Sequence, residues 1–353
     1  MLYDTLAKSS DDDALRDVMG PIDRQILAIR QPSPFTLSSG RHWPEWDRDM
    51  GIAFNAMEGL IREAKFRSFE GVAYTFGRQT MDLSPEGTNA LFAALNLSPA
   101  GGPAQPEQVD TLTSAAQYLQ EKPIRDIDFF KMAGFTEVKA IDVSGFEGAE
   151  IILDLNAEMP LTLSGTCDFL VDGSLLDNVF DPIAALRNAV KLLRPNGRLY
   201  MSNAGNYSAH IGGIPYVIFT PIWFYDYFCM NGFLDCQIYV TVYEPNGQLT
   251  FFLGYEYTLR KWDNGYIKPI VSEYPIQISV FAERDEKSTW HRTPTQHAYR
   301  SDVEWDNYEA TVRSFIKRGR PSLMRSKATT VSQTPPPGWL LCLPDGTLKD
   351  LHR

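Results

Sequence analysis

Acidic residues stand at the ends of three short apolar segments of the sequence. Asp142, Asp154 and Asp172 each close a run of β-branched and aliphatic residues, and Gly77 closes a similar run that also holds aromatic residues. If these runs are neighbouring parallel strands, their ends meet in the crevice at the carboxyl edge of the sheet, where open α/β sheets bind ligands. The sequence therefore predicts an acidic ligand-binding crevice.

The chemistry that suits these carboxylates is the recognition of a nucleoside. A carboxylate at the end of the second strand can accept two hydrogen bonds from a ribose diol, and Asp142 holds that position. Asp154, followed by the backbone amide of Leu155, offers an acceptor and a donor to the edge of an adenine. The alternative is that these aspartates only form or cap turns, as aspartate commonly does.

The elements that must position these residues alternate along the middle of the chain. A helix is expected over 106–119, a second over 127–132 closed by Gly134, and a third from Pro182 onward. Alternating strands and helices predict a parallel, doubly wound sheet, because each parallel crossover needs a long connection. The expected strands are 71–77, 138–142, 150–154, 168–172 and 198–202, followed by 234–243, 250–257 and 276–283.

The fold class that we predict is α/β. It is a Rossmann-like, doubly wound, mostly parallel seven-stranded sheet with helices on both faces and a terminal antiparallel hairpin that turns at 244–247. A helical section over 1–66 precedes it, either as a lid over the ligand or as a surface for a homodimer. Residues 67–300 form the ligand-binding domain, and 301–353 form a C-terminal helix and an extended tail.

The composition limits the classes of partner. With 353 residues, of which 44% are hydrophobic and 22% charged, the chain can form one large domain or two small ones. A formal net charge of −11 repels phosphate backbones, so no nucleic acid partner is expected. The four cysteines have neither the spacing of a zinc site nor that of a disulfide framework, so we expect no metal and a reduced environment.

The sequence also indicates where the protein works. The most apolar stretch, 211–224, is shorter than the ~20 residues of a bilayer span and is interrupted by Pro215 and Pro221. The N-terminus lacks the basic start and apolar core of a secretory signal. We therefore expect a cytoplasmic protein with no membrane partner.

Several stretches of the chain are informative when they are taken in order. They are Ala-Ile-Asp142-Val-Ser, Ile-Leu-Asp154-Leu-Asn, Cys-Asp168-Phe-Leu-Val-Asp172-Gly-Ser, Leu176-Asp177-Asn178-Val179 and Leu193-Arg194-Pro195-Asn196-Gly197. With these stretches, the chain over residues 68–284 resembles the class I S-adenosylmethionine-dependent methyltransferases. The most specific block runs from Asp168 to Gly197, where the last two stretches stand in place of the family's Leu-Glu-His-Val and Leu-Lys-Pro-Gly-Gly.

The resemblance implies that S-adenosylmethionine is the cofactor and assigns residues to its parts. Gly77 would lie beside the methionine part, and Asp142 would bind the ribose hydroxyls. Carboxylates near a sulfonium and an ammonium are physically favourable. The other assigned residues are Asp154 and Leu155 at the adenine, and Asp172 and Gly173 below the amino group and the transferring methyl group.

The turn after the first expected strand departs from the family pattern. Phe76-Gly77-Arg78-Gln79 keeps one glycine, and Gly77, Arg78 and Gln79 are expected to contact the cofactor there. Arg78 either binds the cofactor carboxylate through its planar fork or caps the following helix. Asp142 lies 142 − 77 = 65 positions after Gly77, against about 20 in a compact dinucleotide fold, so a Pro- and Gly-rich loop and an added helix must fill the gap.

An aromatic segment over 207–228 follows the fifth expected strand, where the resemblance places the acceptor. This segment either encloses an apolar acceptor or packs into the core. His210 is the candidate base because its ordinary pKa lies near neutrality, and Tyr207 and Asn203 are expected to face the acceptor. In-line methyl transfer needs alignment and exclusion of water more than it needs a base.

Together these observations favour a methyltransferase that uses S-adenosylmethionine and acts on a small molecule. One alternative is a cyclase or lyase that consumes the cofactor and releases methylthioadenosine without an acceptor. Another is a non-catalytic scaffold, whose crevice would be blocked by side chains. An NAD-dependent oxidoreductase is disfavoured because the full dinucleotide-binding motif is missing.

Overall fold

The structure is a computed structural model that describes residues 51–119, 121–205, 215–244, 247–253, 275–320, 339–342 and 348–350. The candidate residues Tyr207 and His210 lie outside these ranges. So do the helical pattern expected before residue 51 and the end of the strand expected over 250–257.

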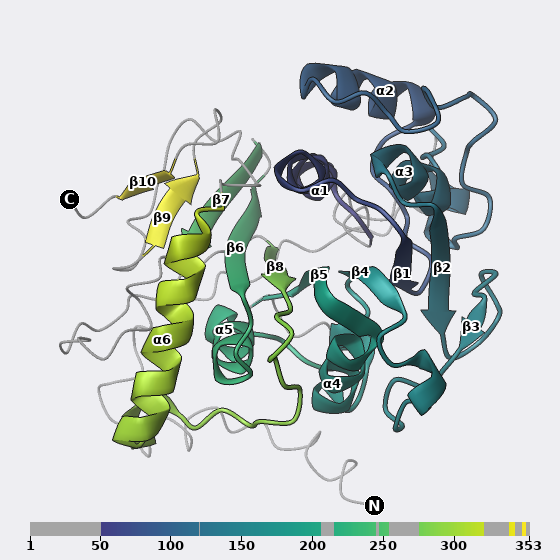
Figure 1. Cartoon of the computed structure of the whole chain (residues 1–353). Helices are drawn as coiled ribbons and strands as arrows, with labels where there is room; N and C mark the ends of the chain where they lie inside the picture. The colour runs from purple at the N-terminus through teal and green to yellow at the C-terminus, as the bar shows by residue number, and fades with distance from the viewer. Residues whose placement is uncertain are drawn as a thin grey trace, which may run out of the picture. The chain divides into compact units, whose positions relative to one another are not determined.

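The described strands form one sheet. They are β1 (Val72–Phe76), β2 (Glu137–Asp142), β3 (Ile151–Ile152), β4 (Cys167–Gly173), β5 (Leu193–Ala204), β6 (Asp235–Glu244), β7 (Gly247–Leu253), β8 (Ile276–Glu283), β9 (Trp339–Cys342) and β10 (Leu348–Asp350). Their order across the sheet is β3-β2-β1-β4-β5-β8-β6-β7-β9-β10 (Figure 1). The strands β1 to β5 pair in parallel, and β8 runs antiparallel to both β5 and β6.

This order confirms the predicted fold class. Its first seven strands make the mostly parallel Rossmann-like sheet with one antiparallel strand, which is the arrangement of the class I methyltransferase fold. The predicted hairpin is also present, between β6 and β7. The antiparallel strands β9 and β10 extend the sheet beyond β7, which the sequence did not predict.

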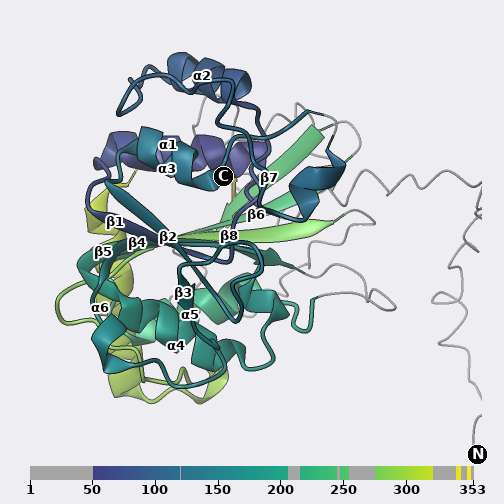
Figure 2. The same cartoon turned by 90° about the vertical axis from the view of Figure 1, so that its right-hand side faces the viewer.

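Helices cover both faces of the sheet (Figure 2). Aromatic and aliphatic side chains of α1 and α3 pack on one face, and those of α4, α5 and α6 pack on the other. None of the described helices is long and apolar enough to cross a membrane. The bounds are α1 (Phe54–Phe66), α2 (Pro85–Ala94), α3 (Asp126–Ala133), α4 (Pro182–Leu192), α5 (Pro221–Met230) and α6 (Asp302–Arg318), with short 3-10 helices η3 (Ala115–Tyr118), η4 (Leu161–Leu163), η5 (Leu176–Asn178) and η7 (His297–Tyr299).

The central strand β4 shows why its sequence is apolar almost throughout. Successive side chains of a strand point to opposite faces, and both faces of this sheet are covered. Phe169 and Val171 are buried beneath α1 and α3, whereas Leu170 is buried on the side of α4 and α5. The two polar residues of the strand, Asp168 and Asp172, therefore stand near its two ends.

Two helix ends confirm the signals read from the sequence. The side chain of Asp181 accepts a hydrogen bond of 3.0 Å from the Ala184 amide at the start of α4, and Pro182 occupies the first helical position. Gly134 ends α3 with φ of 129°, and a Cβ at that position would lie 2.6 Å from the carbonyl oxygen of Phe69. Only glycine suits that close approach.

The prediction of a helix over 106–119 is wrong. The side chain of Asp110 accepts hydrogen bonds from the Leu112 and Thr113 amides, and its own amide donates to the Pro123 carbonyl. These bonds compete with helix formation, so the segment forms turns and only η3. The added helix lies earlier, as α2, whose start is capped by the Ser84 hydroxyl. Together, α2, this loop and α3 account for the long gap between Gly77 and Asp142.

A buried network of charged residues lies at the amino-terminal edge of β5 and β6. Arg320, which follows α6, forms ion pairs with Glu63 of α1 and with Asp235 and Glu283 of the sheet. Arg198 of β5 also donates to Glu63, at 2.6 Å. The side chains of all five residues are at most 5% exposed. The network ties α1 and the end of α6 to the sheet, on the edge opposite the acidic strand ends.

Candidate functional site

Gly77 and Asp142 lie side by side at the carboxyl edge of the sheet. Gly77 follows β1 with φ of 69°, a conformation that favours glycine, and its amide donates to the Ile141 carbonyl at 2.7 Å. A Cβ at position 77 would lie 3.5 Å from Asp142 Oδ2 and 3.3 Å from Leu175 Cδ1. The other carboxylate oxygen of Asp142 accepts from the Ser144 amide at 3.0 Å. One oxygen of Asp142 thus faces the turn after β1, and the ribose assignment stays a prediction.

Asp172 is fully buried at the end of β4 and is held by uncharged donors. Its Oδ1 accepts from the Leu175 and Leu176 amides at 2.8 and 3.2 Å, and its Oδ2 accepts from Asn203 Nδ2 at 2.8 Å. Burial raises the pKa of this carboxyl to about 7, and nearby Asp177 adds to the rise. Among the residues that the structure describes, no lysine or arginine pairs with Asp172.

Asn203 of β5 connects two acidic residues. Its Nδ2 donates to Asp172, and its Oδ1 accepts from the Asp177 amide at 3.0 Å. The Asp177 carboxylate accepts from Ser174 Oγ and from the Ala204 amide, and burial raises its pKa. The amide of Asn203, a residue predicted to face the acceptor, is therefore engaged within this cluster on both sides.

Gln79 lies across the end of the sheet between β1 and β4. Its Nε2 donates to the Phe76 carbonyl at 2.6 Å and to the Gly77 carbonyl at 3.4 Å. Its buried Oε1 accepts no hydrogen bond from the part of the chain that the structure describes. A Cβ at Gly173 would lie 1.9 Å from that Oε1, so the Gln79 side chain fills the space above Gly173.

Arg78 points away from this cluster. Its guanidinium pairs with Glu150 and, at 3.6 Å, with Asp126 at the start of α3, and it donates to the Gly148 carbonyl at 3.2 Å. The contacts of Arg78 fix the loop between β2 and β3 against α3. The structure does not bring it to Asp172.

Asp154 and Leu155 follow β3 at the same edge but differ in exposure. Asp154 Oδ1 accepts from the backbone and the side-chain amides of Asn156, and these hydrogen bonds lower the pKa of the exposed carboxyl. Leu155 is buried in the core on the α4 side. Asn156 Oδ1 in turn accepts from the Asp181 amide at 2.9 Å, which joins this turn to the start of α4. The turn-forming interpretation thus describes the contacts of Asp154 in this structure, and its adenine role stays a prediction.

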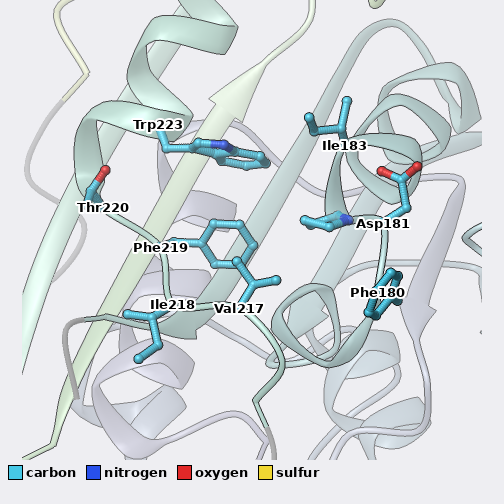
Figure 3. Close-up of a pocket in the computed structure, with 9 residues that line it drawn as sticks. Phe180, Asp181, Ile183, Val217, Ile218, Phe219, Thr220 and Trp223 are labelled. Carbon is cyan, nitrogen blue, oxygen red and sulfur yellow. The ribbon is translucent and has the colours of Figure 1, made fainter. Parts of the chain in front are cut away.

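A pocket of about 570 Å³ opens beside these strand ends, between the starts of α4 and α5 (Figure 3). We call it the α4–α5 pocket. Sequence reasoning noted its aromatic residues on the α5 side but missed Phe180, which precedes α4. The signal that could have found it is its place in a loop immediately before an Asp-Pro helix start. The lining residues are Phe180, Asp181, Pro182, Ile183, Val217, Ile218, Phe219, Thr220 and Trp223.

The described residues hold no group of three or more side chains placed to bind a metal ion. What they bring together at the carboxyl edge is Gly77, Gln79, Asp142, Asp172, Gly173 and Asn203.

Comparison with known proteins gives no match from sequence. No family model matches the chain, and no curated protein is significantly similar to it. Solved structures of S-adenosylmethionine-dependent methyltransferases do align with it. One, from Burkholderia thailandensis, is 1,6-didemethyltoxoflavin-N1-methyltransferase with bound 1,6-didemethyltoxoflavin and S-adenosylhomocysteine. It is 11% identical, the alignment covers 66% of this chain and 80% of that one, and the TM-score is 0.26.

Two further structures align in the same way. A methyltransferase from Aquifex aeolicus is 13% identical over 65% of this chain and 92% of its own, with a TM-score of 0.27. A possible histamine N-methyltransferase from Thermotoga maritima is 12% identical over 65% of this chain and 89% of its own, with a TM-score of 0.28. The fold assignment itself comes from the strand order of the sheet.

Proposed function

We propose that this chain binds S-adenosylmethionine across the ends of β1, β2 and β4 and transfers its methyl group to a small molecule. The observation that carries the proposal is Asp172, a buried carboxylate whose described partners are all uncharged. A buried charge without a counter-ion is costly, so the site favours a ligand that brings a positive charge.

The residues at this edge fit the cofactor in two further ways. Gln79 Oε1 is a buried acceptor that lacks a donor among the described residues, and an ammonium group would supply one. Asp142 presents an oxygen toward Gly77, which has no side chain of its own. We assign Asp142 to the ribose hydroxyls, and Asp172 and Gln79 to the ammonium group. Asp154 and Leu155 are assigned to the adenine.

Binding in this position requires Gln79 to move. Its side chain fills the space above Gly173, where the methionine part would lie. The movement exchanges two hydrogen bonds to carbonyl oxygens for contacts with the ligand. If Gln79 does not move, the chain is a scaffold with a blocked crevice, so the same observation also favours that second candidate.

When bound, S-adenosylmethionine would supply a methyl group on a sulfonium. A lone pair of the acceptor would form the new bond to the methyl carbon, the electron pair of the broken carbon–sulfur bond would stay on sulfur, and the acceptor would release a proton. The chain's own residues align the acceptor and exclude water. Asn203 acts as a positioning residue, because it fixes Asp172 and the turn that begins η5. His210 is proposed to take the proton, and Tyr207 to contact the acceptor.

Calorimetric titration with S-adenosylhomocysteine and S-adenosylmethionine tests the proposal. We expect one site per chain, and Asp142→Ala should weaken binding by about tenfold or more through loss of the ribose hydrogen bonds. The matched control is Asp285→Ala, a half-buried aspartate that follows β8 at the other edge of the sheet. Absence of heat for wild type at millimolar ligand would exclude the proposal.

Incubation with S-adenosylmethionine alone separates transfer from self-consumption. A methyltransferase leaves the cofactor intact until an acceptor is added. Accumulation of methylthioadenosine without an acceptor would instead support the cyclase or lyase alternative.

A further inference from the structure

The α4–α5 pocket is apolar and partly aromatic. The Phe219 and Trp223 rings lie 4.7 Å apart at its inner wall, and Phe180 faces them from the α4 side (Figure 3). The Phe180 ring also contacts the Tyr216 ring, at 6.2 Å between centroids. Such walls suit a flat ligand that stacks on or packs edge-to-face against aromatic rings.

Large apolar side chains at the mouth of this pocket face solvent. Phe180 is 83% exposed, Tyr216 is 70% exposed, and Ile183 and Ile218 are more than two-fifths exposed. Contiguous exposed apolar residues beside a concave site commonly mark a place where a ligand binds. The pocket volume of about 570 Å³ lies within the range of small-molecule sites and suits a compound of one or two rings.

The charge of the lining excludes one class of ligand. Asp181 is the single charged residue among the nine, and its Oδ1 already accepts from the Ala184 amide. None of these nine described residues is a lysine or an arginine that could pair with an anion. A carboxylate or phosphate on the ligand would meet the Asp181 carboxylate, and no basic side chain among the nine would offset the repulsion, whereas a neutral or cationic compound would not be repelled.

The pocket adjoins the proposed cofactor site on two sides. The Phe219 amide donates to the Ala204 carbonyl at 3.0 Å, one residue after Asn203, and the Val217 amide donates to the Asp177 carbonyl at 3.1 Å. On the α4 side, the Asp181 amide is bonded to the turn that follows β3. A ligand in the pocket is therefore next to the end of β5 and the Asp172 cluster.

From this placement we infer that the α4–α5 pocket is the acceptor site, and that the acceptor is an aromatic small molecule that is neutral or positively charged, not an anion. The assignment of this ligand as the methyl acceptor rests on the proposed function. The binding preference itself stands on the lining residues alone.

Three compounds with one ring system test the preference: indole, tryptamine and indole-3-acetate. Their binding is measured by ligand-observed NMR and calorimetry, with and without saturating S-adenosylhomocysteine. We expect indole and tryptamine to bind and indole-3-acetate to bind about fivefold more weakly or worse. Phe180→Ala should weaken indole binding by about three- to tenfold, through loss of an aromatic contact.

The matched control is Phe146→Ala. Phe146 is as exposed as Phe180, at 83%, but lies in the loop after β2 and does not line the pocket. Equal binding of all three compounds, absence of binding, or equal effects of the two substitutions would overturn the inference.

The two proposals fail separately. If S-adenosylhomocysteine binds in an Asp142-dependent manner and none of the three indoles binds, the pocket inference fails and the proposed function stands. If the indoles bind as expected and S-adenosylhomocysteine does not, the proposed function fails and the acceptor role fails with it.

Discussion

Removal of the charge of Asp172 should abolish a pH dependence of cofactor binding. The carboxyl is fully buried, and burial raises its pKa to about 7 in the free protein. The proposed ligand is cationic where it meets Asp172, so it binds the ionised form better and lowers this pKa. Affinity should therefore rise with pH until the carboxyl is ionised in the free protein.

The size of the effect follows from the pKa. With a pKa of about 7, roughly one-tenth of the Asp172 carboxyls are ionised at about pH 6 and roughly nine-tenths at about pH 8. The affinity for S-adenosylmethionine should thus increase about tenfold between these two pH values.

Calorimetric titration of wild type and Asp172→Asn across this pH range is the assay. Asp172→Asn should bind more weakly at about pH 8 and show no rise of its own, which also controls for titration of the ligand. A flat affinity profile for wild type, or the same rise in Asp172→Asn, would refute the reasoning.

Stability provides a second readout for the same group. Because the folded-state pKa of Asp172 is raised, its protonated form stabilises the fold, and that contribution is lost as pH rises through about 7. The rise from 3.8 corresponds to at most roughly 4 kcal/mol. Denaturant unfolding should show Asp172→Asn gaining stability relative to wild type between about pH 5 and pH 8.

Three other substitutions test particular contacts. Gly173→Ala would place a Cβ 1.9 Å from Gln79 Oε1 and would force that side chain to give up its hydrogen bonds to two carbonyl oxygens. Urea unfolding should show a loss of about 1 kcal/mol, and an unchanged midpoint would argue against this packing. Arg320→Met removes a cation shared by three buried carboxylates and leaves Asp235 without its ion-pair partner, so it should cost about 3–5 kcal/mol by the same measurement. Arg313→Met on the exposed face of α6 should stay within about 0.5 kcal/mol, and similar losses would contradict the network. Asn203→Leu removes a hydrogen-bond donor that lowers the pKa of Asp172, so the midpoint of the pH profile of binding should move to higher pH. An unchanged midpoint would show that Asn203 is not a positioning residue for Asp172.

The sequence was sufficient to predict the strands of the parallel part of the sheet because the signals for these strands are local. The runs that contain β2, β3 and β4 each reach an aspartate at their end, and α4 begins at an Asp-Pro pair. The pattern failed over 106–119 because one side chain, Asp110, bonds the backbone of its neighbours and replaces helical hydrogen bonds. Helix propensity and hydrophobic periodicity do not account for this competition between side-chain and helical hydrogen bonds.

The details of the site depend on residues that are far apart in the sequence. Arg78 pairs with Glu150, 72 positions away, and Asn203 bonds Asp172 across 31 positions. Neither pairing can be recognised from residues that are close in the sequence. The partners of Arg78 and of Asn203 are therefore seen only in the folded structure. The position of Gln79 above Gly173 is of the same kind.

A crystal structure with S-adenosylhomocysteine tests the central claim most directly. We expect the ribose hydroxyls on Asp142, the ammonium group beside Asp172, and the Gln79 side chain turned away from Gly173. A ligand bound at another edge of the sheet, or a crevice that stays filled by Gln79 at saturating ligand, would contradict the account.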